Sequence, residues 1–205
     1  QGGHAALWTG GLAESYAPEL DILGVVAMAP AANLPVVLDE LANSVVGGVF
    51  GSFTLAVYSG TYDEIRARDY VRPGARITVQ SMQQRCLTDP STLVSLATSI
   101  FSDSPPWLGS SADGPLGERL EENVPTLLIS VPLLLAQGGA DTLISPAAQD
   151  AYVAERCAAG QSLDYRTYAG RDHMGLVADD SPLIADLHSW TADRFAGVKA
   201  ANTCG

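Results

Sequence analysis

The sequence predicts an α/β protein in which a mostly parallel sheet is interrupted by a long helical insertion. Two stretches, residues 22–29 and 127–137, are continuous apolar runs bounded by turn-forming residues. Such runs are typical of strands buried on both faces, as in a parallel sheet. Between them, residues 31–122 contain helical segments separated by proline and glycine turns. We therefore predict a core formed by residues 1–30 and 123–205, with a helical cap formed by residues 31–122.

The residues before the first buried strand predict one helix. Apolar side chains recur there at near-helical spacing, among them Leu7 and Leu12. Pro18 then breaks the pattern and predicts a turn. A helix followed directly by the buried run at residues 22–29 indicates that strands and helices alternate along the core.

The last third of the chain restores this alternation. The apolar run at residues 127–137 predicts a central strand. Ser145 and Pro146 then supply an N-cap and a first-turn proline, and Gly160 ends the helix that they begin.

Two further elements complete the predicted core. Residues 163–168 alternate between apolar and polar side chains, which predicts a last strand. Residues 182–195 predict a closing helix with Leu183, Trp190 and Phe195 among the apolar residues on one face.

Composition and charge exclude several classes of partner. The chain has 205 residues, enough for one domain or a core with an insertion, and 47% of them are hydrophobic. The net charge of -12, with only 11 basic residues, leaves no positive surface for nucleic acid and would be repelled by an anionic membrane. We also expect no metal site, because the three histidines are scattered and no C-x-x-C spacing occurs.

The longest uncharged stretch, residues 41–62, is long enough to span a membrane. Asn43 and Ser44, together with Gly47 and Gly48, make it too polar and too rich in glycine for exposure to lipid. We predict no transmembrane segment here. The stretch instead fits a pair of helices in contact through small residues and buried against apolar side chains.

The first residues are similar to the end of a nucleophile elbow, the sharp strand-to-helix turn of pattern G-x-S-x-G. Only the last two positions of the pattern are present, as Gln1 and Gly2. The serine would immediately precede Gln1, so we predict that this is the downstream portion of a serine hydrolase. The residue after the nucleophile supplies a backbone N–H to the oxyanion hole, which assigns that donor to Gln1. A glycine-rich segment that simply enters a helix is the alternative.

Asp141 and His173 lie on predicted loops that directly follow strands. In an open α/β sheet, ligands bind beyond the carboxyl ends of the strands, and both loops start from that edge. Serine, acid and histidine is also the chain order of the catalytic triad in α/β-hydrolases. The histidine removes the serine proton, and the carboxylate holds the tautomer of the imidazole. We predict Asp141 as the acid and His173 as the base.

Other residues fit these roles less well. His188 lies inside the closing helix and His4 lies one turn into the first helix, so packing or solvent-facing roles are expected. Asp172 cannot easily fold back onto the ring of its neighbour His173, and Asp164 lies within a strand. No internal G-x-S-x-G occurs that would supply another nucleophile.

The chain resembles the secretory lipases, a family of the α/β-hydrolase superfamily typified by yeast lipase A. The resemblance lies in QGGHA at residues 1–5, GGADTLISP at 138–146, CAAG at 157–160 and the segment that ends at His173. It implies an α/β-hydrolase fold with an inserted helical cap. It also implies Asp141 as the triad acid, His173 as the base and Gln1 as one oxyanion donor, the second donor being upstream and unidentified.

The cysteines bear on the compartment in which the protein works. Cys86, Cys157 and Cys204 form an odd number, which in an oxidising compartment leaves one pair and one further thiol. The resemblance implies that Cys157 bridges to Cys204 and that Cys86 pairs with an upstream cysteine. Low lysine content, an acidic surface and these cysteines favour a secreted protein.

These observations predict a secreted carboxylic-ester hydrolase that needs no cofactor. We expect a triacylglycerol lipase-like enzyme that cleaves acyl esters through an acyl-serine intermediate. The resemblance implies that the apolar cap residues 41–62 form an acyl-chain tunnel, while acyl chain length and the choice between lipase and esterase stay open. An acyltransferase would use the same triad. A catalytically silent hydrolase-fold protein would instead bind lipid or a partner protein under the cap.

The predicted core has few strands. Two or three parallel strands with an open edge should not fold stably alone. We therefore also expect the preceding N-terminal portion of the same protein as a partner.

Overall fold

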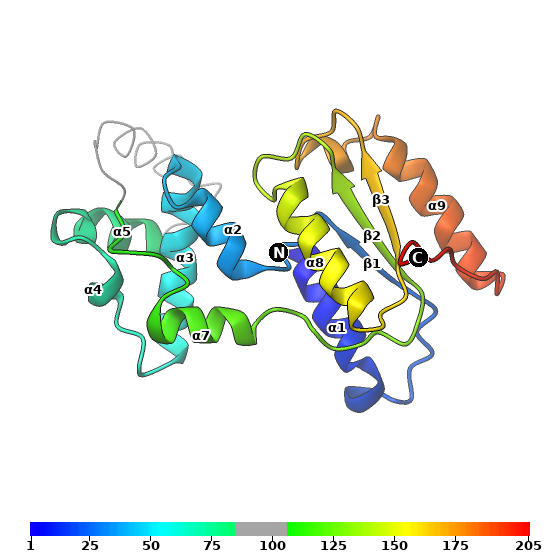
Figure 1. Ribbon diagram of the computed structural model, residues 1–205, viewed down its shortest axis with the longest axis horizontal. Coiled ribbons are helices and arrows are strands. Elements are labelled where there is room, and N and C mark those ends of the chain that lie inside the picture. The colour runs from blue at the N-terminus through cyan, green and yellow to red at the C-terminus, as the bar shows by residue number, and fades with distance from the viewer. Residues whose placement is uncertain (85–105) are drawn as a thin grey trace. The chain divides into compact units, whose positions relative to one another are not determined.

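The computed structural model describes residues 1–84 and 106–205 (Figure 1). The chain divides into two compact units, Gln1–Asn33 with Val124–Gly205, and Leu34–Asn123. We call the first the sheet unit and the second the helical unit. Their roles as a hydrolase core and a cap remain a prediction.

The sheet unit contains a parallel sheet of three strands in the order β1-β2-β3 (Figure 1). The strands are β1 (Val25–Met28), β2 (Leu133–Gly138) and β3 (Asp164–Tyr168). Val25 pairs with Leu133, and Leu134 pairs with Asp164. Every residue of β2 is buried, which agrees with the prediction of a central strand. In β1, by contrast, Met28 is partly exposed, so this strand is not buried throughout.

Helices cover both faces of this sheet (Figure 1). The helices α1 (Gly2–Tyr16) and α8 (Pro146–Ala158) contribute Leu7 and Tyr152 to a core cluster that includes Leu135 of β2. The 3-10 helix η2 (Gly175–Val177) and α9 (Pro182–Phe195) contribute Leu176 and Leu183 to a second cluster, which includes Ala136 of β2. Because side chains alternate along a strand, adjacent residues of β2 pack against the helices on opposite faces of the sheet.

The strand β2 begins later than the sequence predicts. We expected it from residue 127, but β2 starts at Leu133, and Leu127 is exposed. The side chain of Gln161 forms hydrogen bonds with the backbone of the intervening segment. Its Oε1 accepts from the Ile129 N–H at 2.8 Å, and its Nε2 donates to the Ile129 carbonyl at 3.0 Å. A residue whose N–H and carbonyl both bind a side chain cannot pair with a neighbouring strand through them.

The helix α8 begins where its capping residue predicts, whereas the predicted apolar face of α9 is only partly observed. The Ser145 hydroxyl accepts from the Ala148 N–H at 3.0 Å at the start of α8, and Gly160, with φ 90°, follows its end. The predicted apolar face of α9 is wrong at Phe195, which is 77% exposed. Arg194 is buried in its place, with its guanidinium 4.8 Å from the ring centroid of Trp190.

The helical unit is built from short helices around one apolar cluster that includes Leu38, Leu55 and Leu120. Its described elements are α2 (Leu34–Leu41), α3 (Val45–Thr61), α4 (Ala67–Tyr70), η1 (Pro73–Ala75), α5 (Arg76–Gln83) and α7 (Gly114–Glu122). An isolated antiparallel bridge joins Val71 to Trp107. The prediction of a helical insertion is therefore confirmed for the described part of this unit.

The uncharged stretch 41–62 forms one helix, not the predicted pair. The Ser44 hydroxyl accepts from the Gly47 N–H at 2.9 Å and starts α3, which continues for 17 residues. A side chain at Gly47 would collide with the backbone of Leu41, so this glycine allows α3 to pack against the end of α2. Among the described residues, no helix is long and apolar enough to cross a membrane.

A small cavity of about 40 Å³ lies within the helical unit. Its walls come from α2, α3 and the segment around Trp107, and include Leu38 and Leu55. Thr54 contributes one of the polar groups of this lining.

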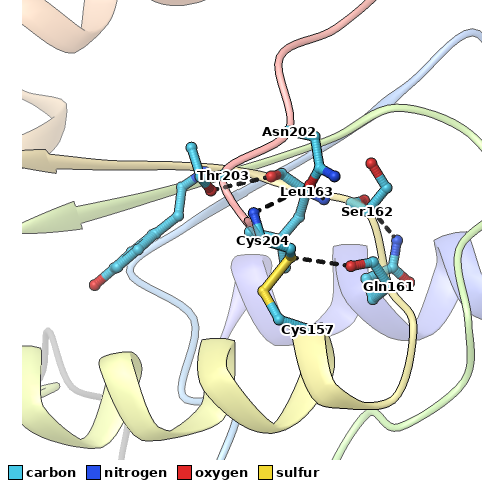
Figure 2. Close-up of a disulfide and its surroundings, with 8 residues drawn as sticks. Cys157, Gln161, Ser162, Leu163, Asn202, Thr203 and Cys204 are labelled. Atoms are coloured by element: carbon cyan, nitrogen blue, oxygen red, sulfur yellow. Dashed lines mark hydrogen bonds between the residues drawn. A yellow bond between two sulfur atoms is a disulfide. The ribbon is translucent and has the colours of Figure 1, made fainter.

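The C-terminal tail lies along the outer edge of β3 (Figure 2). The Thr203 N–H donates to the Leu163 carbonyl at 2.8 Å, and the Thr203 hydroxyl oxygen accepts from the Tyr165 N–H at 2.9 Å. A disulfide between Cys157 and Cys204 fixes the tail to the last turn of α8. The tail thus occupies backbone groups of an edge strand that would otherwise be open to other chains.

The bridge between Cys157 and Cys204 is the one that the family resemblance implies. Cys86, for which an upstream partner is expected, lies outside the described residues.

Replacing both bridge cysteines with serine should lower the free energy of unfolding of the sheet unit by about 2–4 kcal/mol, because the bridge closes a loop in the unfolded chain. The amide protons of Thr203 and Tyr165 should exchange faster, since the tail is then held by hydrogen bonds alone. Chemical denaturation and hydrogen exchange measure both effects. The control is reductant: it should lower the stability of the natural protein by more than that of the serine variant, and an equal effect on the two proteins would contradict this role.

Candidate active site

Asp141 follows the carboxyl end of β2 and is held by backbone donors. Its Oδ1 accepts from the Leu143 N–H at 2.8 Å and from the Ile144 N–H at 2.9 Å. Its side chain is fully buried. A buried carboxylate is tolerated only where hydrogen bonds replace its water, and the turn after β2 supplies two of them.

His173 lies on the loop that follows β3 and faces this carboxylate. Its Nδ1 is 2.8 Å from Asp141 Oδ2, and 28% of its side chain is exposed. An ionised carboxylate can only accept, so in this contact Nδ1 carries the proton and Nε2 of the neutral ring is left as a proton acceptor. The structure therefore brings together the two residues that the sequence predicts as acid and base.

Backbone hydrogen bonds join the two loops. The Gly139 N–H donates to the Tyr168 carbonyl at 2.8 Å, and the Ala140 N–H donates to the Arg171 carbonyl at 2.9 Å. Gly138 lies so close to this second loop that a Cβ there would collide with the Arg171 carbonyl oxygen. The glycine at the end of β2 is what lets the His173 loop approach Asp141.

Side-chain contacts fix the rest of the His173 loop. Arg171 Nη1 lies 2.8 Å from Asp180 Oδ1, and hydrogen bonding to Arg171 lowers the pKa of the Asp180 carboxyl. Asp172 Oδ1 accepts from the Gly175 N–H at 2.6 Å. Asp172, a rival for the acid, is therefore engaged with its own loop and does not orient the His173 ring.

The strand before this loop is also anchored. The Tyr168 hydroxyl donates to Asp186 Oδ2 at 2.8 Å, and burial followed by this hydrogen bond raises the pKa of Tyr168 to about 12. Tyr168 is therefore a neutral donor at physiological pH. Asp164, the other rival acid, forms an ion pair of 2.7 Å with Arg166.

The two alternative histidines lie on helices. His188 is exposed on α9, and His4 is partly buried in the first turn of α1. His188 therefore fits the solvent-facing role that the sequence predicts.

Gln1 precedes the first residue of α1, and its carbonyl accepts from the Ala5 N–H at 3.0 Å. The start of this helix lies at the carboxyl end of β1, since a Cβ at Gly3 would be 2.8 Å from the Met28 carbonyl oxygen. In a parallel sheet this is the edge from which the Asp141 and His173 loops also extend. The role of Gln1 as an oxyanion donor stays a prediction.

The chain matches a known protein family over almost its full length. A model of the family described as Secretory lipase matches residues 1–203. The chain belongs to the secretory lipase family.

Two curated relatives of this chain differ in their described activity. Lipase A of Moesziomyces aphidis is 25% identical over 229 residues, which cover 100% of this chain and 46% of that protein. A protein of Mycobacterium tuberculosis (strain CDC 1551 / Oshkosh), named as a probable inactive lipase, is 24% identical over 208 residues, which cover 96% of this chain and 44% of that protein. The chain spans about half the length of the curated relatives it matches.

Solved structures of lipases and esterases share the fold. Candida antarctica lipase A aligns with a TM-score of 0.73 at 18% identity over 99% of this chain and 48% of its own. The rice cell wall degrading esterase LipA from Xanthomonas oryzae aligns with a TM-score of 0.66 at 15% identity over 95% of this chain and 55% of its own. The chain therefore has the architecture of a C-terminal α/β-hydrolase portion, as the sequence predicts.

Sequence reasoning missed one residue that contacts the pair. Gln137 is fully buried in β2, and its Nε2 lies 3.3 Å from Asp141 Oδ2. An amide within an otherwise apolar run was the available signal, because a buried polar side chain requires partners.

Replacing Gly138 with alanine should lower the free energy of unfolding by about 1–3 kcal/mol, because the added Cβ meets fixed backbone atoms of the His173 loop. The Ala140 amide, which donates to that loop, should lose protection from hydrogen exchange. Thermal unfolding and hydrogen exchange test the two effects. Gly60→Ala is the control, since nothing lies within 4 Å of the added Cβ on that helix. A fully stable Gly138→Ala protein with a protected Ala140 amide would contradict the proposed close approach.

Proposed function

We propose that this protein is a secreted carboxylic-ester hydrolase that cleaves acyl esters of fatty acids. The observation that carries the proposal is the hydrogen bond of 2.8 Å between His173 Nδ1 and the buried Asp141 Oδ2. It lies at the edge of a parallel sheet where α/β enzymes bind their ligands. The relatives named as lipases and esterases support the same reaction class.

In the proposed reaction, a serine immediately before Gln1 is the nucleophile. His173 Nε2 removes its proton as the hydroxyl attacks the ester carbonyl, and the ring then protonates the leaving alcohol. Asp141 holds the Nδ1–H tautomer and stabilises the imidazolium. The Gln1 N–H, at the start of α1, is one donor to the oxyanion that forms. Water activated by the same histidine then hydrolyses the acyl-serine.

Secretion is supported by the family description and by the disulfide between Cys157 and Cys204. Such bridges persist in oxidising compartments and are rare in the cytosol.

The lining of the small cavity in the helical unit is mainly apolar, which supports a hydrocarbon-rich substrate.

Turnover of p-nitrophenyl acyl esters by the complete protein tests the proposed chemistry. His173→Ala should abolish measurable turnover, and Asp141→Asn should lower kcat by about 10⁴-fold because the wrong imidazole tautomer is then favoured. His188→Ala, at an exposed residue of α9, is the control and should retain the natural rate. Undiminished turnover in His173→Ala would exclude the proposed mechanism.

The relative from Mycobacterium tuberculosis, named as a probable inactive lipase, favours a second candidate function. In that case this protein binds a lipid without cleaving it. Absence of turnover with every ester of the series, together with binding of a fatty acid, would support the silent protein. Turnover that depends on His173 would exclude it.

A further inference from the structure

Gln137 is an unusual residue for its position. It lies in β2 between Ala136 and Gly138, and no part of its side chain is exposed. The rest of β2 is apolar, and β2 is the central strand of the sheet. A buried amide at the centre of a sheet needs partners within the protein.

The amide nitrogen of Gln137 has three acceptors at the start of the Asp141 loop. It lies 2.9 Å from the Ile144 carbonyl, 3.3 Å from the Gly138 carbonyl and 3.3 Å from Asp141 Oδ2. The same Oδ2 faces His173 Nδ1 at 2.8 Å. The donors Gln137 and His173 therefore meet on one carboxylate oxygen.

The other end of this amide is left unsatisfied. Gln137 Oε1 is buried and has no hydrogen-bond partner among the described residues. Exchanging the amide nitrogen and oxygen would place Oε1 against three oxygen atoms, so the observed orientation is the one that the surroundings allow. An unpaired buried acceptor destabilises a fold, and an apolar side chain of similar size would avoid that cost. The N–H donor of the Gln137 amide is therefore the group that accounts for a glutamine at this position.

We propose that Gln137 is a positioning residue for the Asp141–His173 pair. This inference rests on the proposed function, in which these two residues are the acid and the base. Gln137 Nε2 donates to Asp141 Oδ2 and so fixes the plane of the carboxylate. The negative charge on Oδ2 is then stabilised by two donors, Gln137 and the His173 ring. Removing this donor concentrates the charge on the oxygen that faces the ring, which favours the imidazolium and raises the pKa of His173.

Replacing Gln137 leaves the other titratable side chains near His173 in place, with the partners that they have in the natural protein. On the loop of His173, Arg171 is paired with Asp180, and Asp172 accepts a backbone N–H. Asp179 follows η2, and His4 lies in the first turn of α1 at the same edge of the sheet. A change in the titration of His173 between variants therefore reports the contact with Asp141.

The experiment compares Gln137→Met and Gln137→Glu with the natural residue in the complete protein. The methionine removes the donor at similar volume, and the glutamate replaces it with a carboxyl group of the same shape. The titration of the His173 ring is followed by NMR, its signal assigned by its loss in His173→Ala, and kcat/KM is measured against pH.

We expect the pKa of His173 to rise in Gln137→Met, because the donor to Asp141 Oδ2 is lost, and to stay close to the natural value in Gln137→Glu, because a carboxyl group buried beside Asp141 stays protonated and still donates. In Gln137→Met the acidic limb of kcat/KM should move to higher pH, and kcat should fall by about tenfold or more because the carboxylate is less well oriented. If Gln137→Met does not fold, Gln137→Leu, which also lacks the donor, takes its place in the comparison.

Gln161→Met is the matched control. Gln161 is also a buried glutamine with backbone partners, but these belong to Ile129 and Ser162 and not to the pair. Its replacement should lower stability and leave the His173 titration unchanged.

Two failures can be told apart. If Gln137→Met leaves the His173 titration and the pH profile unchanged while His173→Ala is inactive, the positioning role is wrong and the proposed function stands. If His173→Ala keeps full turnover, the proposed function is wrong, whatever Gln137 does to the titration.

Discussion

The hydrogen bond between His173 Nδ1 and Asp141 Oδ2 is the contact on which the candidate site depends. The Asp141 side chain is fully buried, and a buried carboxylate without partners would be protonated or would destabilise the fold. Backbone donors from Leu143 and Ile144, the Gln137 amide and the His173 ring surround it. This demand for donors draws the loops after β2 and β3 together, and backbone bonds from Gly139 and Ala140 keep them there.

The sheet provides the rigid frame for these loops. The strand β2 is buried on both faces, so its carboxyl end is held by two helical layers. The outer edge of β3 is covered by a tail that is fixed to α8 by the disulfide between Cys157 and Cys204. The His173 loop therefore extends from a strand that is paired on one side and covered on the other.

An acid and a histidine in contact do not by themselves make an enzyme. They supply a base of the correct tautomer, whereas ester cleavage also needs a nucleophile and donors to the oxyanion. The contact is therefore compatible with both kinds of relative, one named as a lipase and one named as a probable inactive lipase.

The sequence by itself determined the features that local signals encode. The serine cap and the proline after it marked the start of α8, and the strand-to-loop boundaries located Asp141 and His173 at one edge of the sheet. Three features were decided only by the tertiary structure. Hydrogen bonds from Gln161 move the start of β2 to a later residue, and Arg194 is buried where Phe195 was expected. The Gln137 amide contacts Asp141. An apolar run indicates that a segment is buried. It does not identify the side chain, more than thirty residues away in the sequence, that will form hydrogen bonds with the backbone of that segment.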